Sequence, residues 1–315
     1  MTKKFRPFLA TDWDSAKQKY PVGIMPKIDG VRGMKPFGEL VGRSLKSFAN
    51  KQVAKVFGSP IYDGMDGELA VGDETDFDLC RKTSSATSKI EGEYVWTWHV
   101  FDLCEPNVAH LPYKERYDML KKYVDECHAN GELMDVKLVP LYVVNNEQEL
   151  LEWENIWLDM GYEGVIIRDL EAKYKWGRST QREGGYLRIK RFTDGEGEII
   201  RIIEGCTNEN EAQINELGQT YRSSHQANMI PNGMVGSFDV RVLTVPEGLE
   251  GLIEVGQEMR VGAGRLTHEE RKYYFEHPDE FIGKISKWKF FAHGMKDKLR
   301  IPTHQSFRDP TDISE

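Results

Sequence analysis

Apolar side chains recur at intervals of three and four residues over residues 113–130, which predicts a helix with one buried face. That face carries Tyr113, Tyr117, Leu120, Val124 and Cys127. Gly131 follows directly and is a typical helix end, because glycine readily adopts the left-handed conformation found there.

A second helix is predicted after residue 146. Asn146 and Glu149 have the spacing of a capping box, and Gly161 marks the end of the segment. Its apolar stripe consists of Leu150, Trp153, Trp157 and Met160. The apolar residues 165–167 then predict a short buried strand. Glu163 therefore lies between the end of this helix and the start of the strand.

Strand patterns occur on both sides of a polar, glycine-rich segment at residues 193–197. Before it, residues 94–101 are rich in aromatic and β-branched residues. After it, strand-like runs cover about 198–205, 235–245, 252–262 and 282–291, with one short helix beginning at residues 267–270. We therefore expect two domains, residues 1–192 and 193–315. The fold class is α+β, and the second domain is predicted to be a small closed barrel of the OB type.

Composition favours an ordinary globular protein of 315 residues, 39% of them hydrophobic. No apolar run approaches the roughly 20 residues that span a bilayer, and the first residues do not resemble a signal peptide. Cys80, Cys104, Cys127 and Cys206 are widely spaced, which argues against a cysteine zinc site or a disulfide framework. These features favour a reducing, cytoplasmic location.

The net charge of −9 is unusual for a protein that binds nucleic acid, but local charge is what contacts phosphates. Residues 168–191 hold eight Lys and Arg against three acids, and residues 284–308 hold seven against one. Aromatic or glycine residues interrupt both runs, as on surfaces that follow a nucleic-acid backbone. The alternative is that each run is only a solvated face.

Residues 27–32 have the sequence Lys-Ile-Asp-Gly-Val-Arg, in which a lysine amine is a candidate nucleophile. Only the neutral amine reacts, and the usual lysine pKa is about 10.4. Burial, or nearby cations such as Arg32 and Lys190, would lower that pKa. Gly30 would allow a tight turn behind Lys27. The alternative is an ordinary surface Lys-Asp-Gly turn, which the segments that follow in order argue against.

Those segments are Asp66–Leu69, Val100–Leu103, Glu163–Arg168 and Leu187–Lys190. Arg188 and Lys190 alternate with apolar residues, so on a strand both face one side, where phosphates would lie. Glu163 and Glu68 are oxygen ligands suited to Mg²⁺, and Glu68 is equally suited to a ribose hydroxyl. Phe101 is placed to stack on a purine, although an aromatic residue there is more often core.

Together these segments resemble the covalent nucleotidyltransferase superfamily, and most closely the short ATP-dependent DNA ligases of tailed bacteriophages. Gly42-Arg43-Ser44, residues 173–178, residues 299–302 and Phe307-Arg308 carry further similarity. The resemblance implies a nucleotidyltransferase domain of antiparallel sheets with flanking helices before the barrel. It also implies that Lys27 takes AMP from ATP and passes it to the 5′-phosphate of a nick, which the 3′-hydroxyl then seals.

The resemblance also implies a role for each matching residue. Arg32 and Arg43 would contact the nucleotide or the nick phosphate, and Arg188 and Lys190 would hold the α-phosphate. Glu68 would hold the ribose, Phe101 would cover the adenine and Glu163 would bind Mg²⁺, or alternatively Mn²⁺. Nicked duplex DNA would be the partner of a monomeric enzyme. The expected DNA contacts are Arg43, Lys173, Lys175, Arg178, Lys287 and Lys289.

The chain departs from the family pattern at three places. Met25 stands where a polar residue often reads adenine, so we expect backbone groups near Met25, Pro26 and Ile28 to contact the base. Arg188 stands where a lysine is common, and arginine adds a planar fork of donors. No RxDK sequence occurs near the C-terminus. The residues left to orient pyrophosphate are Lys298, Arg300 and Arg308.

Two other functions remain open on the sequence. An RNA ligase or a capping enzyme shares the lysine segment, but the Phe101-Asp102-Leu103 segment and the C-terminal pattern favour a DNA ligase. A non-catalytic DNA-binding protein of the same fold is the alternative from another class, and the presence of every expected reactive residue argues against it.

Overall fold

A computed structural model gives the structure of residues 5–246, 249–293 and 300–308. The chain divides into two compact units. The first comprises Met1–Lys190 together with Asn215–Gln219, and the second comprises Arg191–Ile214 and Thr220–Glu315. No helix in the described ranges is both long and apolar enough to cross a membrane.

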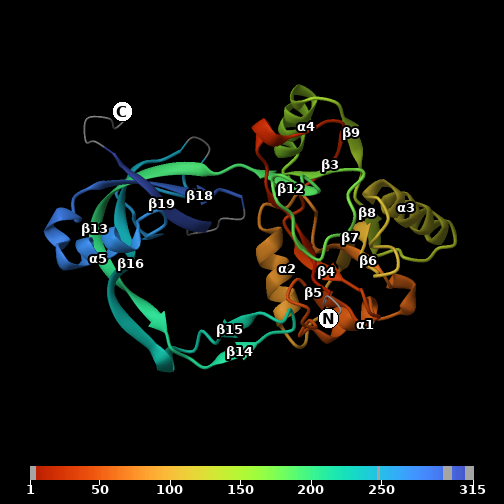
Figure 1. Cartoon of the computed structure of the whole chain (residues 1–315), viewed down its shortest axis with the longest axis horizontal. Coiled ribbons are helices and arrows are strands. Elements are labelled where there is room, and N and C mark those ends of the chain that lie inside the picture. Colours follow the sequence, from red (N-terminus) through yellow and green to blue (C-terminus); the bar gives the residue numbers. More distant parts are fainter. Residues whose placement is uncertain (1–4, 247–248, 294–299, 309–315) are drawn as a thin grey trace. The chain divides into compact units, whose positions relative to one another are not determined.

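The first unit contains two five-stranded sheets (Figure 1). One has the order β2-β12-β10-β3-β9, formed by Thr11–Asp12, Tyr186–Lys190, Gly164–Arg168, Val22–Pro26 and Tyr142–Val144. The other has the order β5-β4-β6-β7-β8, formed by Val41–Gly42, Val31–Met34, Met65–Val71, Trp96–Leu103 and Val136–Leu138. A short parallel pair, β1 (Phe8–Leu9) and β11 (Gly177–Arg178), lies beside them.

Four helices accompany these sheets: α1 (Lys51–Val56), α2 (Leu79–Ser88), α3 (Tyr113–Ala129) and α4 (Glu147–Asp159). The predicted helix over 113–130 is α3, and its apolar face packs in a core with the second sheet. The predicted helix after Asn146 is α4, which packs on the first sheet. The Asn146 side chain accepts a hydrogen bond from the Glu149 amide at 2.9 Å, as the capping pattern predicts.

A third apolar cluster links the two sheets of this unit. It includes Met25 of β3, Phe101 of β7, and Tyr113 and Tyr117 of α3. Because residues of both sheets share this cluster, the strand ends beside it are held in fixed positions. The site described below lies at those strand ends.

The second unit is a closed barrel of the order β13-β16-β17-β19-β18 (Figure 1). Its strands are Thr193–Asn208, Met229–Thr244, Glu258–Gly262, Arg300–Arg308 and Ile285–Phe291. Helix α5 (His268–Glu276) begins with a complete capping box between Thr267 and Glu270. The core contains the fully buried rings of Phe238, Phe281 and Phe290 together with Trp288. The predicted fold class, α+β with a C-terminal closed barrel, is confirmed.

The strand limits differ from those expected. β13 and β16 have 16 residues each, because their antiparallel pairing continues into an exposed extension that apolar patterning does not mark. The run at 252–262 is a strand only from Glu258. β19 was not expected at all, and β14 (Ala212–Ile214) and β15 (Thr220–Arg222) form an exposed hairpin between the two long strands.

Candidate active site

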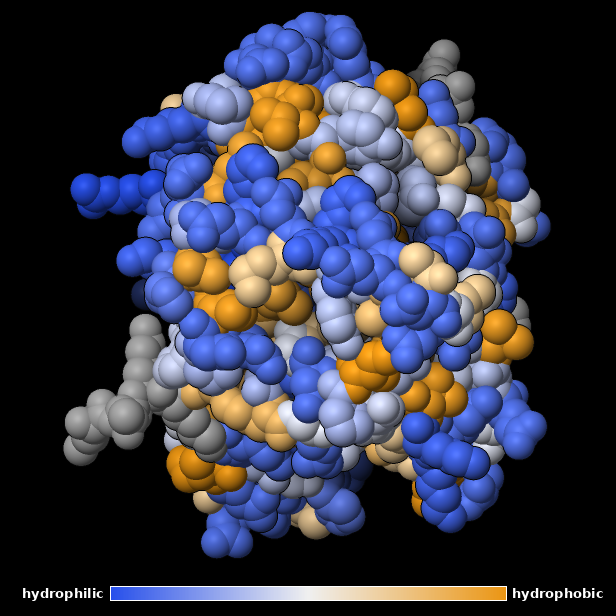
Figure 2. All heavy atoms as spheres, turned by 90° about the vertical axis from the view of Figure 1, so that its right-hand side faces the viewer, coloured by the Kyte–Doolittle hydropathy of each residue, from blue (hydrophilic) through white to orange (hydrophobic). Residues whose placement is uncertain are grey.

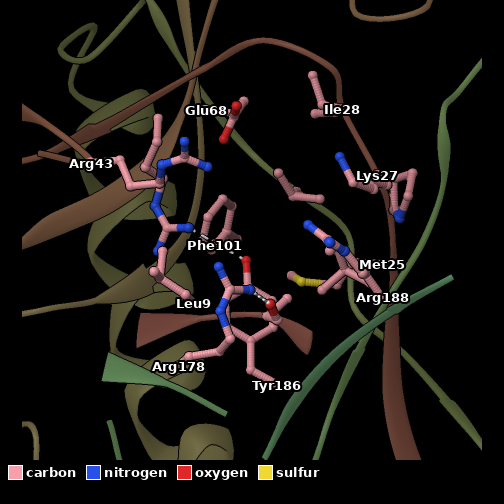
Figure 3. A pocket seen from close by; sticks show the side chains of 15 residues that line it. Leu9, Met25, Lys27, Ile28, Arg43, Glu68, Phe101, Arg178, Tyr186 and Arg188 are labelled. Atoms are coloured by element: carbon pink, nitrogen blue, oxygen red, sulfur yellow. Dashed lines mark hydrogen bonds between the residues drawn. The ribbon is translucent and has the colours of Figure 1, made fainter. Parts of the chain in front are cut away.

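A pocket opens in the first unit at the ends of strands from both sheets (Figure 3). It combines arginine and lysine side chains with an apolar wall. Its lining residues are Leu9, Ala10, Met25, Pro26, Lys27, Ile28, Arg32, Arg43, Glu68, Phe101, Val139, Ile166, Arg178, Tyr186 and Arg188. A site with five cationic side chains and an aromatic ring suits a nucleoside carrying several phosphates.

Backbone pairing fixes the position of Lys27, the first residue after β3. Its amide donates to the Gly164 carbonyl at 2.9 Å, and its carbonyl accepts from the Glu163 amide at 3.1 Å. The ladder between β3 and β10 therefore places Lys27 beside Glu163. The Lys27 Nζ donates to the Glu163 carboxylate, and the lysine side chain is only 17% exposed.

Glu163 binds two ammonium groups at once. Its second oxygen accepts a hydrogen bond from Lys190 Nζ of β12 at 2.8 Å. Burial acts to raise the pKa of the Glu163 carboxyl, but the charges of Lys27 and Lys190 outweigh burial and hold that pKa well below its usual range. Glu163 is therefore a carboxylate wherever both lysines are charged.

The expected lowering of the Lys27 pKa does not hold for this state of the protein. Burial acts to lower the pKa of the Lys27 amine, but the charge and hydrogen bond of Glu163 outweigh it, so the pKa is raised. For Lys190 the balance is opposite: burial dominates and lowers its pKa, with help from the charges of Lys27 and Arg188. Lys27 is thus an ammonium until the Glu163 contact changes.

Glu68 of β6 has an unusual pKa for a carboxyl. Burial raises it to about 7, although the nearby charges of Arg32 and Lys27 act in the opposite direction. Near neutral pH the side chain is thus a mixture of acid and carboxylate. In the protonated form it donates a hydrogen bond, and in both forms it accepts one.

Glycine is needed at position 30 for a different reason from the tight turn that we expected. The backbone at Gly30 needs no left-handed turn; instead, β6 passes so close that a Cβ on Gly30 would lie 2.3 Å from the Leu69 carbonyl oxygen. Gly67 is equally close to the next strand, with 2.4 Å to the His99 carbonyl oxygen. Both glycines therefore allow the strands that carry Arg32 and Glu68 to approach their neighbours.

Arg32 of β4 is held by a carboxylate that the sequence analysis left without a role. Asp66 of β6 accepts from Arg32 Nε at 2.5 Å and from one terminal nitrogen at 2.7 Å. The Tyr174 hydroxyl donates to the same carboxylate at 2.7 Å. The Arg32 guanidinium also lies 4.7 Å from the centre of the Phe101 ring. These contacts leave Arg32 little freedom beside the pocket.

The apolar wall of the pocket contains Phe101 and Met25. Both side chains are buried, and both belong to the cluster that links the sheets. The Tyr113 hydroxyl donates to the Phe101 carbonyl at 3.0 Å and contacts the Met25 sulfur at 3.3 Å. Phe101 is therefore both a core residue and a pocket residue, so the two expectations for it are compatible.

Most residues expected to bind nucleotide line this one pocket: Met25, Pro26, Lys27, Ile28, Arg32, Arg43, Glu68, Phe101 and Arg188. Lys190 and Glu163 lie next to it through their contacts with Lys27. Arg178, expected on DNA, also lines it and donates to the Ala10 carbonyl. The sequence analysis missed Leu9, Ala10, Val139, Ile166 and Tyr186. Ile166 lies within the segment Glu163–Arg168 but was given no role there, and no motif marks the other four, because apolar and aromatic residues become site residues only through the fold.

The other residues expected to contact DNA are not among those that line this pocket. In the first unit, Lys173 is exposed and Lys175 pairs with Glu183 at 2.6 Å. In the barrel, Lys287 pairs with Asp194 at 2.7 Å, and Lys289 Nζ lies 4.2 Å from the centre of the Phe192 ring.

The three candidates for orienting pyrophosphate belong to the C-terminal part of the chain. Arg300 donates to the His293 carbonyl at 3.2 Å, and Arg308 pairs with Glu196 at 2.7 Å. Lys298 lies outside the described residues.

Comparison with known proteins agrees with this geometry. A family model described as the ATP dependent DNA ligase domain matches residues 27–190. No curated protein sequence matches the chain. Two crystal structures of Chlorella virus DNA ligase-adenylate are similar in sequence and fold. One is 25% identical with a TM-score of 0.52, covering 97% of this chain and 100% of that chain. The other is 26% identical with a TM-score of 0.53, covering 98% and 99%.

A structure from a study of Lig E DNA ligases shares the fold, with 19% identity, a TM-score of 0.67 and coverage of 95% of this chain and 98% of that one. The family model begins at Lys27, ends at Lys190 and spans more than half of the chain. These are the two lysines that meet at Glu163. The chain therefore belongs to the ATP-dependent DNA ligases, which join DNA strands through a covalent enzyme–AMP intermediate.

Proposed function

We propose that this ligase seals nicks in duplex DNA, joining a 3′-hydroxyl to a 5′-phosphate, and that Lys27 is the residue that carries AMP. One observation carries the assignment to Lys27. Its amine lies at a pocket rich in arginine, hydrogen-bonded to a buried carboxylate that is itself shared with Lys190. Such a position suits a nucleophile that must be charged at rest and neutral when it attacks.

The nucleotide is proposed to lie with its base on the apolar wall formed by Phe101, Met25 and Ile166. Because the Met25 side chain offers no strong hydrogen-bonding group, backbone groups near Pro26 and Ile28 would contact the base edge. Glu68 would bind the ribose hydroxyls, a role that suits a carboxyl with a pKa of about 7. The triphosphate would then extend toward the cationic side chains of the pocket.

The phosphates would be held by Arg32, Arg43, Arg188 and Lys190. A triphosphate gives Lys190 an anionic partner other than Glu163, and Glu163 then becomes a better proton acceptor because one stabilising charge is gone. Glu163 already accepts the Lys27 hydrogen bond, so it is positioned to take that proton. The neutral Lys27 amine then forms the bond to the α-phosphorus, the bond to pyrophosphate breaks, and the nitrogen loses its second proton to solvent.

The carboxylates beside Lys27 suit a magnesium ion that is bound partly by the protein and partly by the phosphates of the substrate. No group of three or more His, Cys, Asp or Glu side chains able to hold a metal occurs among the described residues. Mg²⁺ commonly binds through one or two carboxylates and the phosphates of a substrate. Glu163 and Glu68 are the alternative protein ligands, with Glu68 the ligand while Glu163 holds the Lys27 proton, and Mn²⁺ shares the oxygen preference. When bound, the ion neutralises phosphate charge.

Nicked duplex DNA is the proposed partner. Six cationic side chains are the proposed DNA contacts: Arg43, Lys173, Lys175, Arg178, Lys287 and Lys289. The proposed pyrophosphate contact is Arg300 or Arg308. We also propose a monomer in the cytoplasm. The face of the molecule in Figure 2 supports the monomer, because its hydrophobic residues are scattered among hydrophilic ones rather than joined in one large patch.

The decisive experiment follows one label through the reaction. Pure protein is incubated with α-labelled ATP and Mg²⁺, and nicked duplex DNA is then added. We expect covalent label on wild type, its transfer to the DNA and its release as AMP as the nick closes. Lys27→Ala should take up no label. Lys114→Ala, which changes an exposed lysine on α3, is the matched control and should react as wild type does.

Three results would contradict the proposal. Label on Lys27→Ala would mean that another residue carries AMP. Label that leaves the enzyme only when RNA ends are supplied would indicate an RNA ligase. A label obtained with GTP in place of ATP would indicate a capping activity.

A further inference from the structure

Arg188 has a carboxylate partner of its own outside the pocket. Its Nε donates to Asp12 Oδ1 at 2.7 Å. Asp12 belongs to β2, the short strand that pairs in parallel with β12, and Asp12 and Arg188 are partners in the strand register. The amide of Trp13 also donates to the Arg188 carbonyl at 2.9 Å. Backbone pairing thus holds the two side chains next to each other.

The contact uses only one of the three guanidinium nitrogens. Within the described ranges, neither terminal nitrogen of Arg188 has a hydrogen-bond partner, and the side chain lines the pocket. Figure 3 shows Arg188 on the same side of the pocket as Lys27 and Met25. Asp12 is not among the lining residues. Its carboxylate therefore contacts the arginine from outside while the terminal nitrogens stay available to a ligand.

This arrangement suits arginine better than lysine. A lysine ammonium has three N–H donors on one nitrogen, so a carboxylate and a phosphate would crowd around a single atom, whereas the arginine fork binds them at different nitrogens in fixed directions. The neighbouring residue on the same face of β12 illustrates the point: Lys190 gives its single ammonium to Glu163 at 2.8 Å. Each basic side chain of β12 thus has a separate carboxylate, and within the described ranges Arg188 keeps both terminal nitrogens without a hydrogen bond while it is paired.

We propose that Asp12 is a positioning residue for the reaction with ATP: it binds Arg188 Nε and so aims both terminal nitrogens at the phosphates. The inference rests on the proposed role of Arg188 as a phosphate ligand. It makes β2 part of the nucleotide site, although β2 contributes no residue to the pocket lining.

A purely structural role for the pair predicts something different. Asp12 is 65% exposed and Arg188 is 31% exposed, and ion pairs of this kind contribute about 0–1 kcal/mol to stability. Removing Asp12 should therefore leave the melting temperature nearly unchanged. An effect on the first chemical step without an effect on melting distinguishes positioning from stabilisation.

The test measures enzyme–AMP formation in a single turnover with α-labelled ATP, and separately the sealing of a nick that already carries AMP. We expect Asp12→Asn to slow enzyme–AMP formation roughly tenfold at low ATP and to leave sealing of the adenylated nick within about twofold. Asp14→Asn is the matched control, because Asp14 is a nearby carboxylate that pairs with Lys17 instead. It should change neither step.

A double-mutant cycle tests the pairing itself. Arg188→Lys should slow enzyme–AMP formation strongly in the wild-type background, but only about threefold when combined with Asp12→Ala, since the competing carboxylate is then absent. Effects that simply multiply would overturn the proposal, as would equal losses in both steps or a silent Asp12→Asn. If Arg188→Ala leaves enzyme–AMP formation intact, the assumed role of Arg188 is wrong, while the Lys27→Ala result still decides the ligase assignment.

Discussion

At the scale of single residues, the sequence predicted the members of the site better than their ionisation. Motif segments marked Lys27 and Arg188, which line one pocket, and Glu163, which contacts Lys27 beside it. The direction of the Lys27 pKa shift was mispredicted because it depends on Glu163, which is 136 positions away in the chain. Asp66 and Asp12 were missed for a related reason: each acts through an arginine on another strand, and sequence spacing does not show such contacts.

Glu68 gives a prediction about stability and pH. Its folded pKa of about 7 exceeds the usual value of 4.5, so between these pH values the unfolded chain releases a proton that the folded protein keeps. The stability due to this group is present below about pH 4.5 and is lost as the pH rises through 7. The free energy of unfolding of Glu68→Gln should therefore rise by about 1–2 kcal/mol relative to that of wild type between pH 4.5 and pH 8.

Urea unfolding at a series of pH values measures this difference. The expected gain is smaller than the full pKa shift would give, because the side chain is partly exposed to solvent. Glu152→Gln, at an exposed position on α4, is the control and should show no such trend. A constant difference between Glu68→Gln and wild type across this range would contradict the raised pKa.

At the scale of elements, helix limits were predicted more closely than strand limits. α3 and α4 have apolar stripes of helical period and identifiable caps, so their ends follow from local sequence. β13 and β16 continue well beyond their buried parts, because backbone pairing alone extends them into solvent. β19 has one buried residue, His304, among exposed and half-buried ones in irregular order, so no period marks it.

A buried cluster of charged side chains joins β7, α3 and β10. Asp102 of β7 accepts from Arg116 of α3 at 2.8 and 3.1 Å and also from Arg168 of β10. The Arg168 guanidinium lies 3.8 Å from the centre of the Tyr113 ring, and all three charged side chains are buried. The cluster therefore couples both sheets to α3 behind the pocket.

Removing the shared carboxylate should destabilise the protein strongly. Asp102→Asn leaves two buried guanidinium groups without a counter-ion, which we expect to cost about 3–5 kcal/mol of unfolding free energy. The exposed Asp118 pairs with Lys114 on the same helix, so Asp118→Asn should cost no more than about 0.5 kcal/mol. Denaturant titration of both variants measures these changes. Similar losses of unfolding free energy in the two variants would show that the buried cluster stabilises the protein no more than an exposed ion pair does.

At the scale of the whole molecule, the overall charge of −9 hides local excesses of positive charge. The two units have separate apolar cores, and each carries one of the basic segments. The net charge argues against nucleic-acid binding, whereas the local basic segments argue for it. How these segments are used on DNA is a question about electrostatics, which salt dependence can answer.

Affinity for nicked DNA should fall steeply as salt rises. Each phosphate contact contributes about −0.9 to the slope of log affinity against log salt, so three or more contacts give a slope of roughly −3 or steeper. Replacing Lys287 and Lys289 together with alanine should make the slope shallower by up to about 2. Lys114 and Lys121, both paired with acids on α3, serve as the control pair. A flat salt response in wild type would show that the basic segments are only solvated faces.

The shared contacts of Glu163 have a consequence for the chemical safety of the resting enzyme. A neutral amine in an open pocket would react with a small acylating agent that diffused in, such as an acyl phosphate, and the stable amide formed would inactivate that molecule. The ammonium form of Lys27 has no lone pair to offer, and Glu163 maintains that form. With the role proposed for Lys27, this contact keeps the amine from side reactions until a nucleotide changes the partners of Glu163.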